Sequence, residues 1–252
     1  MNKTFSLCLS LLVAVSCSIK EDRTGCPCWL QVDPTQLYRP AEVFGWGIEM
    51  LFNEKVTSES SVMEYTVPRG TVAVTAIGPT RHKSIERKLE ILPGYQADSL
   101  YGHRSRINTQ CEMAYDILSL RKQFATIALK MDIPSGHEVY PYCLHIKSNT
   151  GGWMLDSLEG MEGEFDFTPQ LEDTNTFTFR VPRQRDSSMT VDVIDGDYTI
   201  ETIKLGEMIE RAGFDWHKDS LEDITLQINL SDYKVEINIT GWESTILMDV
   251  II

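Results

Sequence analysis

The chain has 252 residues, which suits one large or two small domains, and its formal net charge at pH 7 is −14. So acidic a chain lacks the clusters of lysine and arginine that neutralise phosphates, and we expect no nucleic-acid partner. Hydrophobic residues make up 42% of the sequence, which predicts a packed core and excludes a disordered chain.

The N-terminus has the pattern of a secretory signal peptide, with an apolar stretch at 5–15 that ends in small Ser16. Cleavage after Ser16 leaves Cys17 as the new N-terminal residue, which is the arrangement that a bacterial lipoprotein signal requires. We therefore expect residues 1–16 to be removed, Cys17 to carry acyl chains such as palmitate, and residues 17–28 to form a tether. The other interpretation is an ordinary secretory signal with an incidental cysteine. A membrane-spanning helix is disfavoured because the apolar stretch is shorter than the roughly 20 residues that a span needs.

Four further cysteines would remain in the exported chain: Cys26, Cys28, Cys111 and Cys143. They could form two disulfides in three connectivities. Cys26-Pro27-Cys28 has one residue between its cysteines, so it is neither a CxxC redox motif nor half of a zinc site. Buried free thiols or one structural disulfide are the simpler expectation, and we expect no bound metal.

Alternating apolar residues dominate the chain after the tether and predict strands that bury one face. The clearest alternations occupy residues 46–52, 127–133 and 177–181. Shorter strands, punctuated by proline and glycine, are predicted at 29–33, 62–67, 71–77, 85–92, 143–147, 164–168 and 189–194. The apolar alternations at 226–230 and 235–239 flank Ser231-Asp232, which predicts a hairpin with a tight turn.

Helices are few. Leu205, Met208, Ile209 and Ala212 have the spacing of one amphipathic helix, and Gly213 lies where such a helix ends.

A second short helix is predicted from Met113 to Leu120, and a new series of strands begins at Phe124. We therefore place a domain boundary there, with domains at 29–119 and 120–252. Short strands with turn signals between them predict a mainly β fold of β-sandwiches with one or two short helices.

The sequence contains no catalytic or metal-binding pattern. No histidine lies in a GxSxG, HxH or HExxH context, and His82 and His137 lie in polar, turn-like stretches where we expect them to be solvated. Glu164 and Asp166 alternate with phenylalanines, which is typical of the wet face of a strand and not of a calcium loop. We expect neither a cofactor nor enzymatic activity.

Several segments in a fixed order carry a resemblance. These segments are Cys17 with Ser18-Ile19-Lys20-Glu21-Asp22, Cys26-Pro27, Ala97-Asp98-Ser99-Leu100-Tyr101, Leu120-Arg121-Lys122-Gln123-Phe124-Ala125, Phe179-Arg180-Val181-Pro182-Arg183, Leu221-Glu222-Asp223-Ile224 and Gly241-Trp242-Glu243. Together they resemble the FimB-like anchor subunits of type V fimbriae, a family of fimbrillin-like outer-membrane lipoproteins. The resemblance runs from Cys17 to the C-terminus and implies two transthyretin-like β-sandwich domains.

The resemblance also implies a function without an active site. An anchor subunit is held in the outer membrane by its lipid, at the cell surface, and carries the base of a fimbrium. Stalk subunits of such fimbriae join by strand donation, in which a supplied strand satisfies an open sheet edge. In this chain Ile246, Met248, Val250 and Ile252 would share one face of the segment 244–252, which makes it the candidate docking strand. Alternatively, this segment simply completes its own sheet.

A second function remains open, that of a surface lipoprotein that binds glycans. A glycan-binding protein of this kind is expected to have a flat surface with exposed aromatic rings. Trp46, Trp153 and Trp242 each lie beside a glycine, so their rings could be accessible to a sugar.

Overall fold

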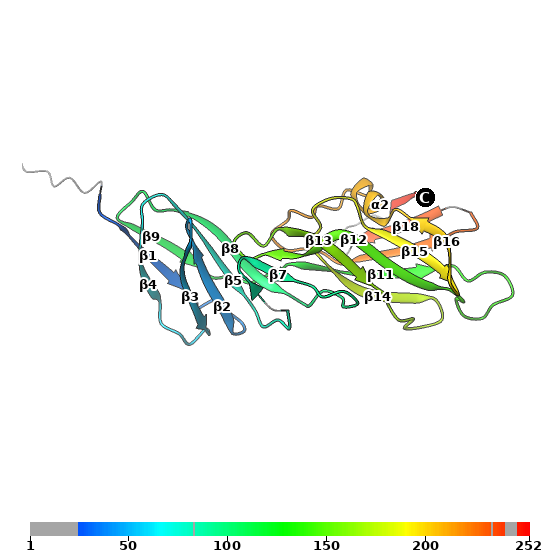
Figure 1. The fold of residues 1–252 in the computed structure, drawn as a ribbon, viewed down its shortest axis with the longest axis horizontal. Coiled ribbons are helices and arrows are strands. Elements are labelled where there is room, and N and C mark those ends of the chain that lie inside the picture. Colours follow the sequence, from blue (N-terminus) through cyan, green and yellow to red (C-terminus); the bar gives the residue numbers. More distant parts are fainter. Residues whose placement is uncertain (1–24, 83, 233, 240–245) are drawn as a thin grey trace, which may run out of the picture.

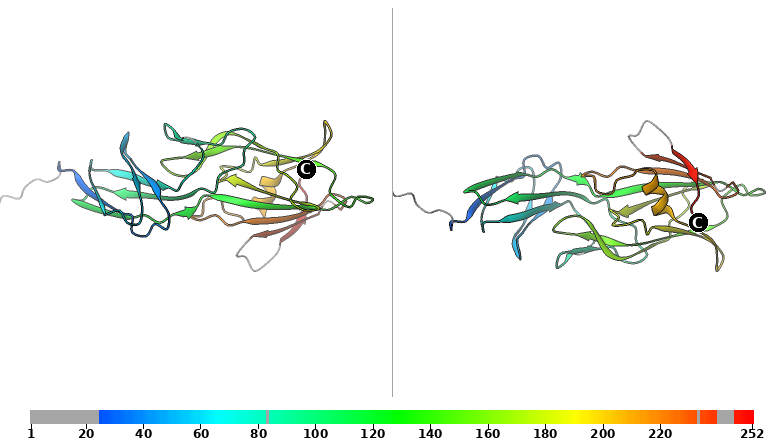
Figure 2. Two further views of the ribbon diagram at one scale, coloured as in Figure 1. Left: turned by 90° about the horizontal axis from the view of Figure 1, so that it is seen from below. Right: turned by 90° about the horizontal axis from the view of Figure 1, so that it is seen from above.

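The computed structural model describes residues 25–82, 84–232, 234–239 and 246–252. Within this part of the chain nearly all regular structure is β, and α2 (Leu205–Arg211) is the single helix. The molecule is elongated and has two halves along its long axis (Figure 1). Two further views show the same elongated outline (Figure 2). The mainly β fold predicted from the alternations is confirmed.

The first half consists of two sheets around a shared core. The smaller sheet has the order β4 (Met63–Val67), β1 (Cys28–Asp33) and β9 (Met113–Ile117). The larger sheet has the order β10 (Arg121–Lys122), β8 (Tyr101–Asn108), β5 (Thr71–Ile77), β2 (Ala41–Trp46) and β3 (Met50–Val56). Apolar residues from both sheets, such as Leu30, Val43 and Val74, are fully buried in one cluster, and the removal of this surface from water holds the sheets together.

The second half is a larger sandwich. One sheet has the order β14 (Thr176–Pro182), β11 (Phe124–Met131), β17 (Ile224–Asn229), β18 (Lys234–Ile239) and β19 (Ile246–Asp249). The other has the order β16 (Tyr198–Ile203), β15 (Thr190–Asp195), β12 (Cys143–Met154), β7 (Lys88–Glu90) and β6 (Ser84–Ile85), and β13 (Gly160–Phe167) also pairs with β12. Ile127, Ile146 and Leu226 are among the fully buried residues of its core.

One short segment of the chain crosses between the halves. Strands β6 and β7 precede β8 in sequence, yet β7 pairs with β12 of the second half, with Leu89 opposite Trp153. Both side chains are fully buried there. The boundary between residues 119 and 120 stays a prediction, and the pairing adds that residues 84–90 join the sheet of the second half.

The predicted helix and hairpin are confirmed. In α2 the side chains of Leu205, Met208 and Ile209 are buried, and Gly213 follows the helix with a φ of +84°, in the left-handed region that glycine adopts readily. Strands β17 and β18 pair with Asn229 opposite Lys234, so that Ser231-Asp232 lies in the turn.

Three local predictions were wrong. Residues 113–117 form β9 and not a helix, because their backbone pairs in parallel with β1 over Trp29 to Asp33. Residues 46–52 are not one strand: the Gly47 N–H donates to the Glu49 carbonyl at 2.9 Å, which turns the chain between β2 and β3 and leaves Ile48 97% exposed. The predicted strand at 85–92 is the β6–β7 hairpin.

Candidate functional site

The C-terminal strand β19 lies at the edge of its sheet. It pairs antiparallel with β18, with Met248 opposite Val235 and Ile246 opposite Ile237. It is the last strand in the sheet order, so within the described residues its outer edge has no strand partner. An unpaired edge presents free backbone donors and acceptors, to which another extended chain can add.

The side chains of the candidate docking strand differ in burial. Ile246 and Met248 are half-buried and pack against the core of the second half, and Val250 is buried. Ile252 is exposed, as is Leu247, whose side chain is 70% accessible on the opposite face of the strand. The face that these residues share is therefore already occupied up to Val250 by the chain's own core.

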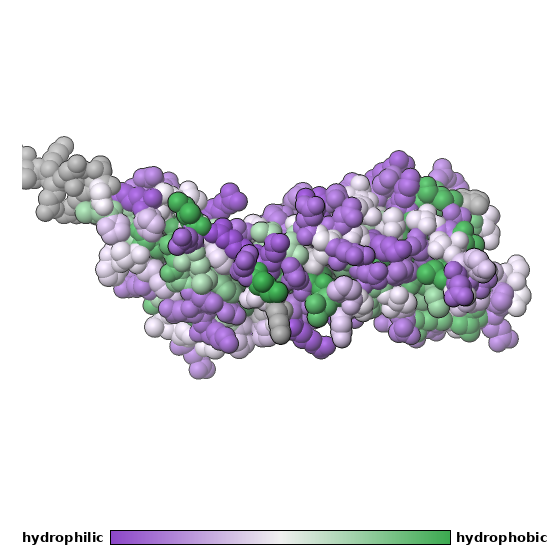
Figure 3. Space-filling view, viewed as in Figure 1, coloured by the Kyte–Doolittle hydropathy of each residue, from purple (hydrophilic) through white to green (hydrophobic). Residues whose placement is uncertain are grey.

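The last residues leave the sheet of β19 and reach the facing sheet. The Lys204 N–H donates to the Ile251 carbonyl at 2.8 Å, and Lys204 directly follows β16, the edge strand of that sheet. Exposed Tyr198 and Ile200 of β16 and exposed Ile252 give this end of the sandwich an apolar surface. A hollow of about 400 Å³ lies between Ile200 and Ile252. In Figure 3 apolar patches are visible near the end that holds the C-terminus, as well as at the centre and in the first half, on a face that is mostly hydrophilic.

The opposite end of the molecule holds the start of the described chain. Cys17, the predicted lipidation site, lies outside the described residues. No helix in the described part is long and apolar enough to cross a membrane. Cys26, Cys28, Cys111 and Cys143 carry free thiols in the structure, and of these only Cys28 is buried.

Two histidines bind carboxylates without forming a nucleophilic site. The His103 Nε2 lies 3.0 Å from Asp116 Oδ2, and the Ser105 hydroxyl donates to that same oxygen at 2.6 Å. A catalytic serine must instead donate to its histidine, so this arrangement cannot activate Ser105. His145 likewise lies 2.6 Å from Asp166 across β12 and β13. Among the described residues no three His, Cys, Asp or Glu side chains are grouped to hold a metal ion.

His82 differs from the expectation, whereas His137 is exposed as predicted. The His82 side chain is only 8% exposed, and its Nε2 accepts a hydrogen bond of 3.2 Å from the Asp98 N–H. Burial lowers the pKa of His82 more than the nearby Asp98 carboxylate raises it. No pattern near His82 in the sequence indicates this burial, because Asp98 and Trp153, which lie beside the ring, come from other parts of the chain.

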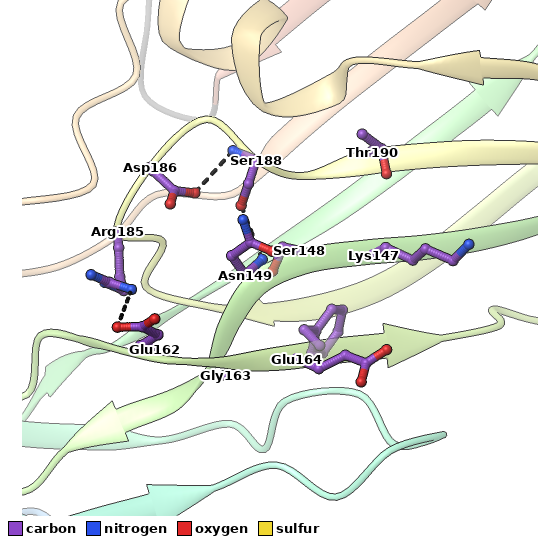
Figure 4. A pocket seen from close by; sticks show the side chains of 11 residues that line it. Lys147, Ser148, Asn149, Glu162, Gly163, Glu164, Arg185, Asp186, Ser188 and Thr190 are labelled. Atoms are coloured by element: carbon purple, nitrogen blue, oxygen red, sulfur yellow. Dashed lines mark hydrogen bonds and ion pairs between the residues drawn. The ribbon is translucent and has the colours of Figure 1, made fainter.

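One hollow on the surface of the second half is lined mainly by polar residues. It has a volume of about 720 Å³ and lies beside β12 and β13, where Arg185 pairs with Glu162 at 3.4 Å (Figure 4). On its other side Ser188 Oγ accepts the Asn149 N–H at 3.0 Å. Glu164 points outward, as expected for the wet face of a strand, and Phe165 beside it is buried. The hollow therefore contains one internal ion pair, and Phe165, the aromatic residue that lines it, is buried.

Trp46 and Trp153 do not form a sugar-binding platform. Trp46 and Trp153 are 5% and 0% exposed, and their indole N–H groups donate to Thr75 Oγ1 and to the Gln123 carbonyl. Trp242 lies outside the described residues. The glycines beside Trp46 and Trp153 therefore do not make their rings accessible.

Comparison with known proteins finds a similar fold in solved structures. The chain matches no protein-family model and no curated protein. Among solved structures it is similar to the fimbrial anchor protein Mfa2 from Porphyromonas gingivalis, with 12% identity over 90% of this chain and 100% of that one, at a TM-score of 0.60. It is also similar to a proposed polysaccharide-binding protein from Bacteroides thetaiotaomicron, with 13% identity over 88% and 98% of the two chains, at a TM-score of 0.58.

A third similar structure is a proposed adhesin from Bacteroides ovatus, with 11% identity over 91% of this chain and 97% of that one, at a TM-score of 0.56. All three similarities extend over nearly the whole of both chains. The fold expected from the resemblance to fimbrial anchor proteins is therefore confirmed, and each of the three proteins is described as fimbrial, adhesive or binding.

Proposed function

We propose that this chain is a non-catalytic fimbrial subunit at the cell surface. It is held in the outer membrane by a lipid on Cys17 and docks stalk subunits by β-strand complementation. The observation that carries the proposal is the position of the two ends. The described chain begins beside β1 at one end of the long axis, and its C-terminus lies toward the other (Figure 1). A subunit that joins a bilayer to a fibre needs its attachment points separated in this way.

The unpaired edge of β19 supports the docking part of the proposal. Backbone hydrogen bonds to an added strand supply affinity, and apolar side chains beside that edge supply pockets. Leu247 and Ile252 are exposed, and exposed Ile200 of the facing sheet lines the same hollow as Ile252. The partner is therefore a stalk subunit that contributes an extended, alternately apolar strand.

A separate question is whether the segment 246–252 stays in its own sheet or is donated to another subunit. Its half-buried Ile246 and Met248 and buried Val250 favour a strand that stays in its own sandwich and offers its edge. Deletion of residues 246–252 tests this: we expect the variant to lose stability to urea as well as stalk binding. A variant that stays as stable as the full chain and loses only stalk binding would instead identify the segment as donated.

The anchoring part is tested by Cys17→Ala in cells that carry fimbriae. We expect the variant to lose labelling by a palmitate analogue and its fimbriae to be released into the medium. Cys143→Ala is the matched control and should keep both lipid and attachment. Fimbriae that remain attached to cells with Cys17→Ala would overturn the anchor function.

A further inference from the structure

Three cysteines lie close together where β1 begins. Cys26 precedes β1, Cys28 is its first residue, and Cys111 comes two residues before β9, which pairs with β1 in parallel. The Trp29 N–H donates to the Glu112 carbonyl at 2.8 Å. The backbone next to Cys28 therefore contacts the backbone next to Cys111.

Arg69 holds the two approaching segments in place. Its Nε donates to the Cys26 carbonyl at 2.6 Å, and its Nη1 donates to the Gln110 carbonyl. One guanidinium thus binds the residue two before Cys28 and the residue before Cys111. The hydrogen bonds of Arg69 and the bond between Trp29 and Glu112 therefore hold the two chain segments that carry Cys28 and Cys111 side by side.

The two thiols differ in access. Cys28 is fully buried at the edge of the first core, and its thiol contacts that of Cys111. Burial, with this contact as a second cause, raises the pKa of the Cys28 thiol. Cys111 is exposed, and its Sγ lies 3.0 Å from the Met113 carbonyl. An oxidant from solution therefore meets Cys111 first.

We propose that Cys28 and Cys111 form a disulfide in the exported chain. The oxidant is a protein or small molecule that itself carries a disulfide. The Cys111 thiolate attacks one sulfur of that disulfide and releases the other as a thiol. The Cys28 thiol loses its proton and attacks the Cys111 sulfur, so that the second oxidant thiol leaves. Two protons and two electrons pass from the cysteines to the oxidant.

The cross-link ties the start of β1 to the segment before β9. The ring that it closes contains β1 to β8, and a ring of this length removes much of the freedom of the unfolded chain. The inference rests on export to an oxidising compartment and not on stalk docking. Cys28 is also the first residue of β1, so a pull on the chain before β1 would reach the cross-link before the rest of the strand.

The pairing is tested by digesting the exported full chain without reduction and identifying the linked peptides by mass spectrometry. We expect one species that joins the peptides of Cys28 and Cys111, and free thiols at Cys26 and Cys143. A peptide that joins Cys26 to Cys111, or unmodified thiols at both Cys28 and Cys111, would overturn the proposal.

A second measurement avoids substitution of the buried cysteine. A reductant should lower the melting temperature of the oxidised chain by about 5–15 °C, as expected for a disulfide in a chain of this size. Because Cys111 is exposed, the Cys111→Ser variant should fold and melt at one temperature with or without reductant. The Cys143→Ser control should keep the full response. A response to reductant that persists in Cys111→Ser would contradict the pairing.

Discussion

The Arg183 guanidinium donates a hydrogen bond of 2.8 Å to the side-chain oxygen of Gln123, and both side chains are fully buried. Gln123 lies just before β11, and its side-chain nitrogen donates to the carbonyls of Gly102 in the first half and Asp219 in the second. Arg183 also donates to the Trp216 carbonyl. The two side chains thus connect the segments that meet between the halves.

Removal of the Arg183 side chain should be strongly destabilising. Burial lowers its pKa to about 10, so the guanidinium is still charged at neutral pH. In Arg183→Ala the Gln123 oxygen and the Trp216 carbonyl lose their donor in a buried site, and we expect a loss of about 3–5 kcal/mol in the free energy of unfolding by urea. Arg185→Ala is the control: Arg185 pairs with exposed Glu162, and its removal should cost less than about 0.5 kcal/mol. Equal losses in the two variants would contradict a structural role of Arg183.

His82 should make the fold sensitive to mild acid. Its folded-state pKa is lowered by burial, so below about pH 6.5 the unfolded chain takes up a proton before the folded one does. The stability from neutral His82 is complete above that pH and is lost as the pH falls through its folded-state pKa. Protonation also removes the Nε2 acceptor of the Asp98 N–H.

Urea midpoints at pH 7.5 and 5.5 measure this effect. We expect His82→Gln to show a smaller drop between the two pH values than the unaltered chain. His137→Gln, which changes an exposed histidine, should keep the full drop. The idea fails if the two variants respond alike.

Gly152 should be irreplaceable where β7 pairs with β12. A Cβ at this position would lie 2.0 Å from the Leu89 carbonyl oxygen, and the φ of Gly152 is +154°. Gly152→Ala must therefore push β7 away from the sheet, and we expect a loss of about 2 kcal/mol or more. At Gly47 a Cβ would meet only the Leu51 side chain at ordinary contact distances, so Gly47→Ala should cost clearly less. Hydrogen exchange of the Leu89 and Trp153 amides would show whether the strands separate.

Leu247→Lys should block addition of a strand to β19 without unfolding the chain. Lysine on an edge strand disfavours pairing with another chain, and the side chain of Leu247 is exposed. We expect stability to change by less than about 0.5 kcal/mol and affinity for a stalk subunit to fall about tenfold or more. Met50→Lys places the same charge on an exposed residue of β3, an edge strand of the first half, and should leave binding unchanged. If only Met50→Lys weakens binding, docking occurs at the other end of the molecule.

The sequence by itself determined most of the strands, the helix and the hairpin. The alternation along 127–133 and the helical spacing of Leu205 and Met208 indicate directly which side chains are buried. Burial of those side chains stabilises the strand and the helix. The absence of a recognisable catalytic motif also came from residue types and spacing alone.

Only the tertiary structure decided which segments meet. Met113–Ile117 forms a strand because its backbone pairs with β1, which lies far away in the sequence. Leu89 belongs to the sheet of the second half because β7 pairs with β12. The burial of the His82 side chain and the interaction of the Cys28 side chain with that of Cys111 likewise depend on segments that are distant in sequence. Pairing and desolvation depend on neighbours in space, and a periodic pattern along the chain carries no record of those neighbours.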